Sequence, residues 1–120
     1  RVNQAQLAEM FMQSDAWLYP PHDFRETCCI TALELQAGGV LCFYRMNGAV
    51  GETAGQYGIP IPLDSSPDDI VDIISTTLSK DNTEKRQQAR AWALQQTWAT
   101  RAKQLLGVCQ DLLKEKEYDS

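Results

Sequence analysis

The sequence predicts an α/β fold in three layers, in which about three mainly parallel strands are flanked by helices. Residues 16–19 (AWLY) and 40–44 (VLCFY) are short apolar runs with the length of buried strands. Between them, apolar residues recur at helical spacing over 29–37, and Gly38 and Gly39 follow as a helix C-cap requires. Strand, helix and strand joined by short connections predict a parallel pair with a crossover helix.

Further elements are predicted on both sides of this unit. Residues 4–13 are expected to form a helix with one apolar face, made of Leu7, Ala8, Met10 and Phe11. A brief helical turn is expected over 48–54. Residues 59–63 (IPIPL) predict an edge strand, because their prolines cannot donate to a neighbouring strand on both sides.

Three helices are predicted in the last part of the chain. Ser66 is the expected N-cap of the first, with Pro67 at its first position, and this helix continues through Leu78. Residues 83–95 and 98–117 predict two more. The last has an apolar stripe made of Trp98, Ala102, Leu105, Leu106, Cys109, Leu112 and Leu113. We expect the final helices to pack along one side of the sheet.

Two acids, Glu26 and Glu34, stand eight residues apart around the start of the helix over 29–37. In an open α/β sheet, ligands bind at the carboxyl ends of the strands, and a helix N-terminus there offers N–H groups to phosphate. A carboxylate accepts two hydroxyl hydrogen bonds at once, which suits a sugar diol. The pair therefore predicts a pocket in which a pyrophosphate lies between two sugars.

These residues also carry a family resemblance. The run RETCCITALELQAGG is similar to the signature E-G-F-G-x-x-x-x-E-A-x-A-x-G of family 4 (group 1) retaining glycosyltransferases, and the Tyr19-Pro20 pair before it fits as well. MNGAVGETA resembles the family's G-G-x-x-E element, with Gly48 and Glu52 in corresponding places; Glu52 either braces the cleft or is a surface acid. The segment 1–20 resembles the helix and strand that precede the signature.

The resemblance implies a Rossmann-like fold of the GT-B type, with residues 1–120 as the C-terminal half of the nucleotide-sugar-binding domain of a larger two-domain enzyme. That enzyme would transfer a hexose from a nucleoside diphosphate sugar to a saccharide, lipid or other hydroxyl acceptor held by an N-terminal domain outside this chain. The isolated piece is expected to be inactive. The implied donor-binding residues are Glu26, Thr27, Cys28, Cys29, Ile30, Thr31 and Glu34. Glu26, at the donor sugar, is the catalytic candidate.

The same resemblance implies no metal and no cofactor, because basic side chains and a helix N-terminus balance the phosphate charge. Composition adds that nucleic acid is a poor partner: 11 Lys and Arg face 16 Asp and Glu, for a net charge of −5. No apolar run approaches the length of a membrane span. We therefore expect a cytoplasmic protein that touches a membrane only through its other half.

Other reactive side chains are given plainer roles. Cys28, Cys29, Cys42 and Cys109 form no metal-binding spacing and are expected to be reduced, packed thiols. His22, the single histidine, is interpreted as a loop residue at the cleft rim and not as a general base. The three tryptophans are expected to pack in the core.

Three alternatives stay open. Thr27, Cys28 and Cys29 stand where the family has G-F-G, which favours a non-catalytic interaction module of the same fold as the first alternative. A sugar-nucleotide epimerase of related architecture and an unrelated small nucleotide-binding fold are the other two.

Overall fold

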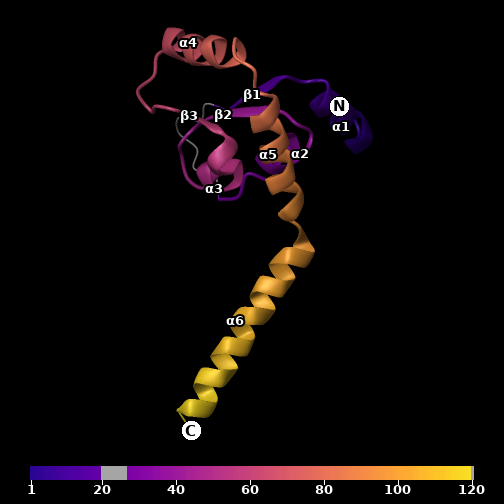
Figure 1. Ribbon diagram of the computed structural model, residues 1–120, viewed down its shortest axis with the longest axis vertical. Coiled ribbons are helices and arrows are strands. Elements are labelled where there is room, and N and C mark those ends of the chain that lie inside the picture. Colours follow the sequence, from indigo (N-terminus) through magenta and orange to yellow (C-terminus); the bar gives the residue numbers. More distant parts are fainter. Residues whose placement is uncertain (20–26, 120) are drawn as a thin grey trace.

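The computed structural model describes residues 1–19 and 27–119. The elements, in chain order, are α1 (Gln4–Met12), β1 (Ala16–Tyr19), α2 (Ile30–Ala37), β2 (Leu41–Arg45), α3 (Val50–Ala54), the 3-10 turn η1 (Gly55–Tyr57), β3 (Ile59–Ile61), α4 (Pro67–Leu78), α5 (Thr83–Gln95) and α6 (Trp98–Tyr118). Figure 1 shows one sheet covered by helices, with α6 leading away from it. The predicted α/β class and the predicted helices and strands are confirmed within a few residues at each end.

The sheet has three parallel strands in the order β1-β2-β3. Trp17 pairs with Cys42 of β2, and Phe43 on the other side pairs with Ile59 of β3. Every residue of β2 is buried, as expected for the central strand of a parallel sheet covered on both faces. The proline-containing β3 lies at an edge, as its sequence predicts.

Alternating side chains of β2 divide the core into two halves. On one face, Tyr44 packs with Ala32 of α2 and with Val50 and Ala54 of α3. On the other face, Leu41 and Phe43 cluster with Ile61 of β3 and are covered by the isoleucines of α4, Ile70, Ile73 and Ile74. Helices therefore cover both faces, which gives the three layers that the sequence predicts.

The end of α2 explains why β2 begins one residue later than expected. Gly39 has φ +81°, which favours glycine, and its N–H donates to the carbonyl oxygen of Gln36 at 2.9 Å. The N–H of Val40 donates to the carbonyl oxygen of Leu35 at 3.0 Å, and both side chains pack together. These contacts form a Schellman cap, so Val40 closes the helix instead of starting the strand.

A capping box starts α4. The N–H of Asp69 donates to Ser66 Oγ at 3.2 Å, and the N–H of Ser66 donates to Asp69 Oδ2 at 2.9 Å. The bonds from Ser66 lower the pKa of Asp69. Ser66 is thus the N-cap, and Pro67 the first helical residue, as predicted.

Helix α5 packs on the outer side of α2 and on η1. Its buried residues are Ala89 and Ala93, whose small side chains let the two helices approach closely. Arg90 Nη1 also donates to the carbonyl oxygen of Ala37 at 2.7 Å, at the last residue of α2. This helix therefore packs against the rest of the fold, as expected.

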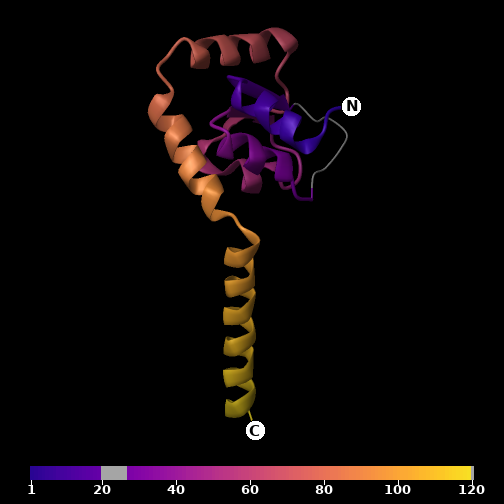
Figure 2. The same ribbon diagram turned by 90° about the vertical axis from the view of Figure 1, so that its right-hand side faces the viewer.

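Helix α6 does not pack on the sheet, which corrects the expectation that both final helices do so. It extends away from the rest of the fold (Figures 1 and 2), and the molecule measures 62 × 34 × 32 Å. None of its residues is buried, and Trp98 at its start is 85% exposed. The periodicity predicted the helix and its apolar stripe correctly, but the predicted burial of Trp98 and of Cys109 was wrong.

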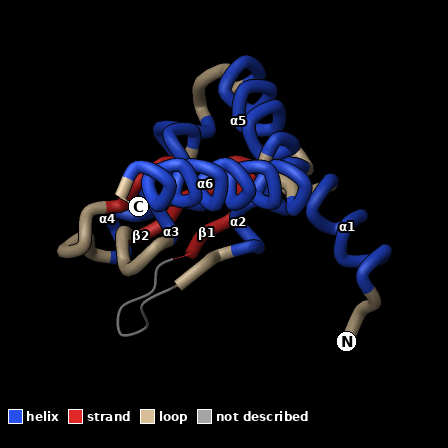
Figure 3. The backbone as a smooth tube through the Cα atoms, turned by 90° about the horizontal axis from the view of Figure 1, so that it is seen from below, coloured by secondary structure: helices blue, strands red, loops and turns tan. Residues whose placement is uncertain are grey.

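Helix α1 lies at the periphery next to the N-terminus (Figure 3). Phe11 packs against the cluster of Leu35, Val40 and Cys42, which fixes the helix beside α2. Met10, expected on the same apolar face, is exposed.

Candidate functional site

The start of α2 follows β1 at the carboxyl edge of the parallel sheet, where the sequence places the donor site. Cys29 is the N-cap, makes no side-chain capping bond and is buried against Tyr44. Thr27 and Cys28 are exposed just before it, and Ile30 and Thr31 are exposed in the first turn. The helix start is therefore open to solvent on one side and anchored by Cys29 on the other.

Backbone hydrogen bonds decide which N–H groups remain for a ligand. Ile30 donates to the carbonyl oxygen of Cys28 and Ala32 donates to that of Cys29, both at 3.2 Å. For the N–H of Thr31, the described part of the chain provides no acceptor. Of the five residues expected to offer N–H groups to a diphosphate, Ile30 already uses its own, whereas the N–H of Thr31 makes no hydrogen bond within residues 1–19 and 27–119.

Glu34 lies on the solvent-facing side of α2. It follows Ile30 and Thr31 by one turn, and all three are exposed, whereas Ala32 and Leu35 face the core. A ligand at the open start of α2 would thus lie on the same helix face as the Glu34 carboxylate. The contact of Glu34 with a ribose stays a prediction.

Glu26 and His22 lie outside the described residues. The proposed contact of Glu26 with the donor sugar, and the loop role of His22, therefore stay predictions. Thr27 is the first described residue after residues 20–26 and comes three residues before α2 begins.

The loop after β2 reaches the same edge of the sheet, because parallel strands end together. Tyr19 of β1 pairs with Tyr44, one residue before β2 ends. Gly48 then turns the chain with φ +74° into α3, where Glu52 is exposed. Gly48 thus lies in the second loop at this edge, and Glu52 lies in the short helix that follows it.

Arg45 is a residue that the sequence reasoning missed. It ends β2 with only 2% of its side chain exposed, and its Nη2 donates to the carbonyl oxygen of Ser65 at 3.1 Å. Strand alternation places it on the α4 face with Phe43, opposite Tyr44 and α2. An arginine directly after an apolar run was the available signal, but such a residue usually marks a strand end in solvent.

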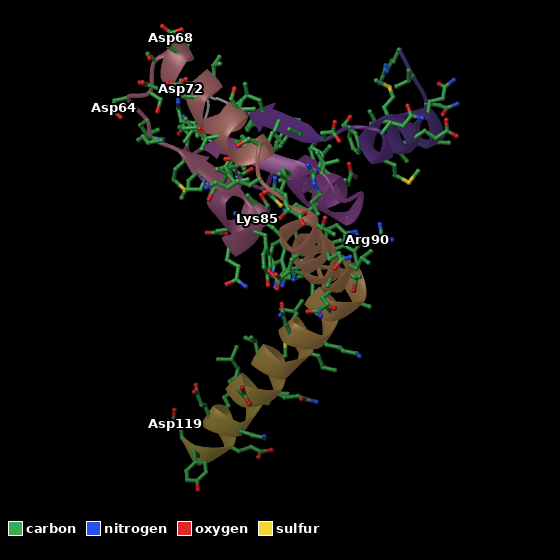
Figure 4. All side chains as sticks on the ribbon, turned by 45° about the horizontal axis from the view of Figure 1, so that its top comes forward. Asp64, Asp68, Asp72, Lys85, Arg90 and Asp119 are labelled. Carbon is green, nitrogen blue, oxygen red and sulfur yellow. The ribbon has the colours of Figure 1, made fainter. Side chains whose placement is uncertain are left out.

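A hollow of about 380 Å³ lies on the α4 side of the sheet. Its lining residues are Pro62, Asp64, Ser65, Asp69, Asp72 and Ile73. Figure 4 shows Asp64 and Asp72 at the same end of the molecule as α4. The hollow lies on the opposite face of the sheet from α2, so it is distinct from the start of α2. Its acidic side chains would also repel a diphosphate. Across residues 1–19 and 27–119, no group of three His, Cys, Asp or Glu is placed to hold a metal.

The cysteines divide into two pairs. Cys29 and Cys42 are buried, whereas Cys28 and Cys109 are exposed, which corrects the expectation that all four are packed. Burial, with the nearby Cys29 as a smaller cause, raises the pKa of Cys42 to about 12. Cys42 is therefore an inert thiol, and Cys28 is the accessible one beside the candidate site.

Among the helices of the described residues, none combines the length and the apolar character needed to cross a membrane. A comparison with known protein families finds none that matches this chain, and a comparison with curated proteins finds no match either. The glycosyltransferase resemblance consequently rests on the motif residues of the sequence alone.

Proposed function

We propose that this chain is the donor-binding part of a retaining glycosyltransferase that transfers a hexose from a nucleoside diphosphate sugar to a hydroxyl acceptor. The observation that carries the proposal is the start of α2. It lies at the carboxyl edge of a parallel sheet, is open to solvent at Thr27, Cys28 and Thr31, and has the exposed Glu34 one turn further on. This is where α/β folds bind nucleotides.

In the proposed complex, the diphosphate lies against the first turn of α2. The helix dipole and the N–H of Thr31 favour negative charge there. Glu34 accepts hydrogen bonds from the ribose hydroxyls, and Glu26 orients the donor sugar. Neither acid is required as a nucleophile, because the leaving phosphate can take the acceptor proton in a retaining reaction of this kind. Turnover needs the acceptor-binding domain, so the expected activity of this chain alone is binding, in the cytoplasm.

Titration calorimetry with UDP, GDP and ADP tests the proposal. We expect one of the three to bind, and Glu34→Gln to weaken it by about tenfold, because hydrogen bonds to a charged group are lost. Glu9→Gln is the matched control, since Glu9 is an exposed acid on α1, away from the α2 start. If none of the three nucleotides binds at millimolar concentration, the proposal is wrong.

A non-catalytic interaction module is the second candidate, and a specific observation favours it. Thr27 and Cys29 replace the two glycines of the family signature, and Cys29 is anchored in the core. Less backbone freedom near the phosphate reduces how closely a diphosphate can approach. Absence of nucleotide binding together with an intact fold would favour this candidate.

A further inference from the structure

The apolar stripe of α6 is the largest feature of the fold that the proposed donor site does not use. Leu105 is 65% exposed and Leu113 is 62% exposed, although leucine is normally buried. A contiguous exposed apolar surface on a helix marks an interaction site. Most helical stability in proteins comes from packing of an apolar face, so a partner that covers the stripe would stabilise α6.

The spacing of the stripe is that of a coiled coil. Five residues of the stripe, together with Lys116, alternate steps of four and three residues, which is the heptad pattern of a two-helix seam; Leu106 and Leu113 lie beside this seam. The seam residues are Trp98, Ala102, Leu105, Cys109, Leu112 and Lys116. We propose that α6 pairs with α6 of a second copy of this chain to form an antiparallel coiled coil.

Facing seam residues in the antiparallel register complement one another in size and charge. Leu105 faces the partner's Cys109, the small Ala102 faces the partner's Leu112, and Trp98 faces the partner's Lys116, an arrangement suited to a cation–π contact. A parallel, in-register pair would place Lys116 against the partner's Lys116 and would bury two like charges at the seam. Charge at the seam therefore favours the antiparallel orientation.

Flanking charges favour the same register. Arg101, beside the seam near the start of α6, comes opposite the partner's Glu115 near the other end. Within one chain, the Arg101 guanidinium donates to the neutral amide oxygens of Gln96 and Gln104, which do not compensate its charge. Two symmetric ion pairs thus form across the antiparallel dimer, whereas the parallel register brings Arg101 opposite the apolar Leu106. A second copy supplies both halves of this pattern, because each chain carries both charges.

Sedimentation of the full chain at roughly 10 to 300 µM tests association first. We expect a monomer–dimer equilibrium, with Arg101→Glu and Glu115→Arg each weakening the dimer by about tenfold, because each single reversal creates two like-charge pairs. The double variant Arg101→Glu/Glu115→Arg should restore wild-type association. Circular dichroism of each variant checks that the helices are retained. A monomer across the whole range overturns the proposal and indicates that another molecule covers α6.

Disulfide trapping then tests the orientation in a Cys28→Ser background. Cys109 lies one helical turn, about 6 Å along the axis, from the partner's Cys109 in the antiparallel register, too far for a ready disulfide. We expect oxidation to link Leu105→Cys chains through the introduced thiol and the partner's Cys109. Chains whose α6 carries only Cys109, or only the introduced thiol in Leu105→Cys/Cys109→Ser, should stay largely unlinked. If either of these single thiols links efficiently to the same thiol of the partner, the helices pair in parallel and the proposed orientation is wrong.

Discussion

Arg86 of α5 donates a hydrogen bond from Nη1 to the carbonyl oxygen of Gly39 at 3.0 Å, and from the same atom to that of Asp15 at 2.7 Å. The guanidinium thereby links α5 to the residue just before β1 and to the cap of α2. Arginine is suited to this role because its fixed donors reach two acceptors at once. The position of α2, and hence of the candidate site, depends in part on a residue far along the chain.

Replacing Arg86 by methionine should lower the free energy of unfolding by about 2 kcal/mol, since charge-assisted hydrogen bonds to two carbonyl oxygens are lost. Urea denaturation measures the change. Lys85→Met is the matched control: Lys85 is the adjacent exposed cation of α5 and should change stability by less than about 0.5 kcal/mol. Equal effects of the two substitutions would contradict the structural role of Arg86.

Gly55 should not tolerate a side chain. It has φ +63°, and a Cβ atom there would lie 3.1 Å from the nearest atom of the Trp92 indole. We expect Gly55→Ala to lower the free energy of unfolding by about 1 to 3 kcal/mol, from backbone strain and overpacking together. Gly107→Ala is the control with the opposite sign, because a Cβ atom at Gly107 would meet nothing within 4 Å and alanine favours helix. A neutral Gly55→Ala in thermal melts would contradict both the backbone strain and the overpacking.

Stability should fall as pH rises through the alkaline range. Burial raises the pKa of Cys42 to about 12 in the folded chain, whereas a thiol in the unfolded chain has a pKa of about 8.5. Above about pH 8.5 the unfolded chain has therefore lost a proton that the folded chain keeps, and the slope approaches about 1.4 kcal/mol per pH unit. The contribution is complete below the unfolded pKa and is lost towards pH 12.

Urea melts of the wild type and of Cys42→Ala at about pH 7 to 10 measure this slope. Cys42→Ala should start less stable but decline less steeply with pH. Cys28→Ser should decline in parallel with the wild type, because Cys28 is exposed. Parallel curves for the wild type and Cys42→Ala would rule out the buried thiol as the cause.

A bound nucleoside diphosphate should protect Cys28 from alkylation. Cys28 is exposed directly before the start of α2, and Cys109 is exposed on α6, far from the site. Mass spectrometry after brief iodoacetamide treatment compares the two thiols in one sample. We expect saturating nucleotide to slow modification of Cys28 severalfold and to leave Cys109 unchanged. Equal rates with and without bound nucleotide would place the ligand elsewhere.

Local patterns in the sequence predicted most of the fold for physical reasons. Gly39 and Ser66 satisfy the backbone groups of their own helix ends, so the boundaries of α2 and α4 follow from nearby residues. What covers a helix depends on distant parts of the chain or on other molecules, and here the periodicity of α6 was misleading. Trp98 fits a buried stripe equally well whether the stripe meets the sheet or a second chain.

The candidate site was predicted only in part. Thr27 to Thr31 could be placed at a helix start because the apolar spacing and the glycine cap fix α2 between two strands. The hydrogen bond from the Ile30 N–H to the carbonyl oxygen of Cys28 could not be predicted, because it depends on how tightly the first turn closes. Arg45 was missed since its burial results from the strand lying between α4 and α2, a tertiary arrangement that its neighbours in sequence do not encode.

The layering of the sheet has a consequence for biosynthesis. Leu41, Phe43 and Ile61 complete one face of the sheet, but the helix that shields them, α4, comes later in the chain. At ribosomal elongation rates, this apolar surface remains uncovered for on the order of a second or more before Ile74 of α4 has been synthesised. Nascent chains interrupted in that interval are the form of this protein that holdase chaperones should recognise most readily.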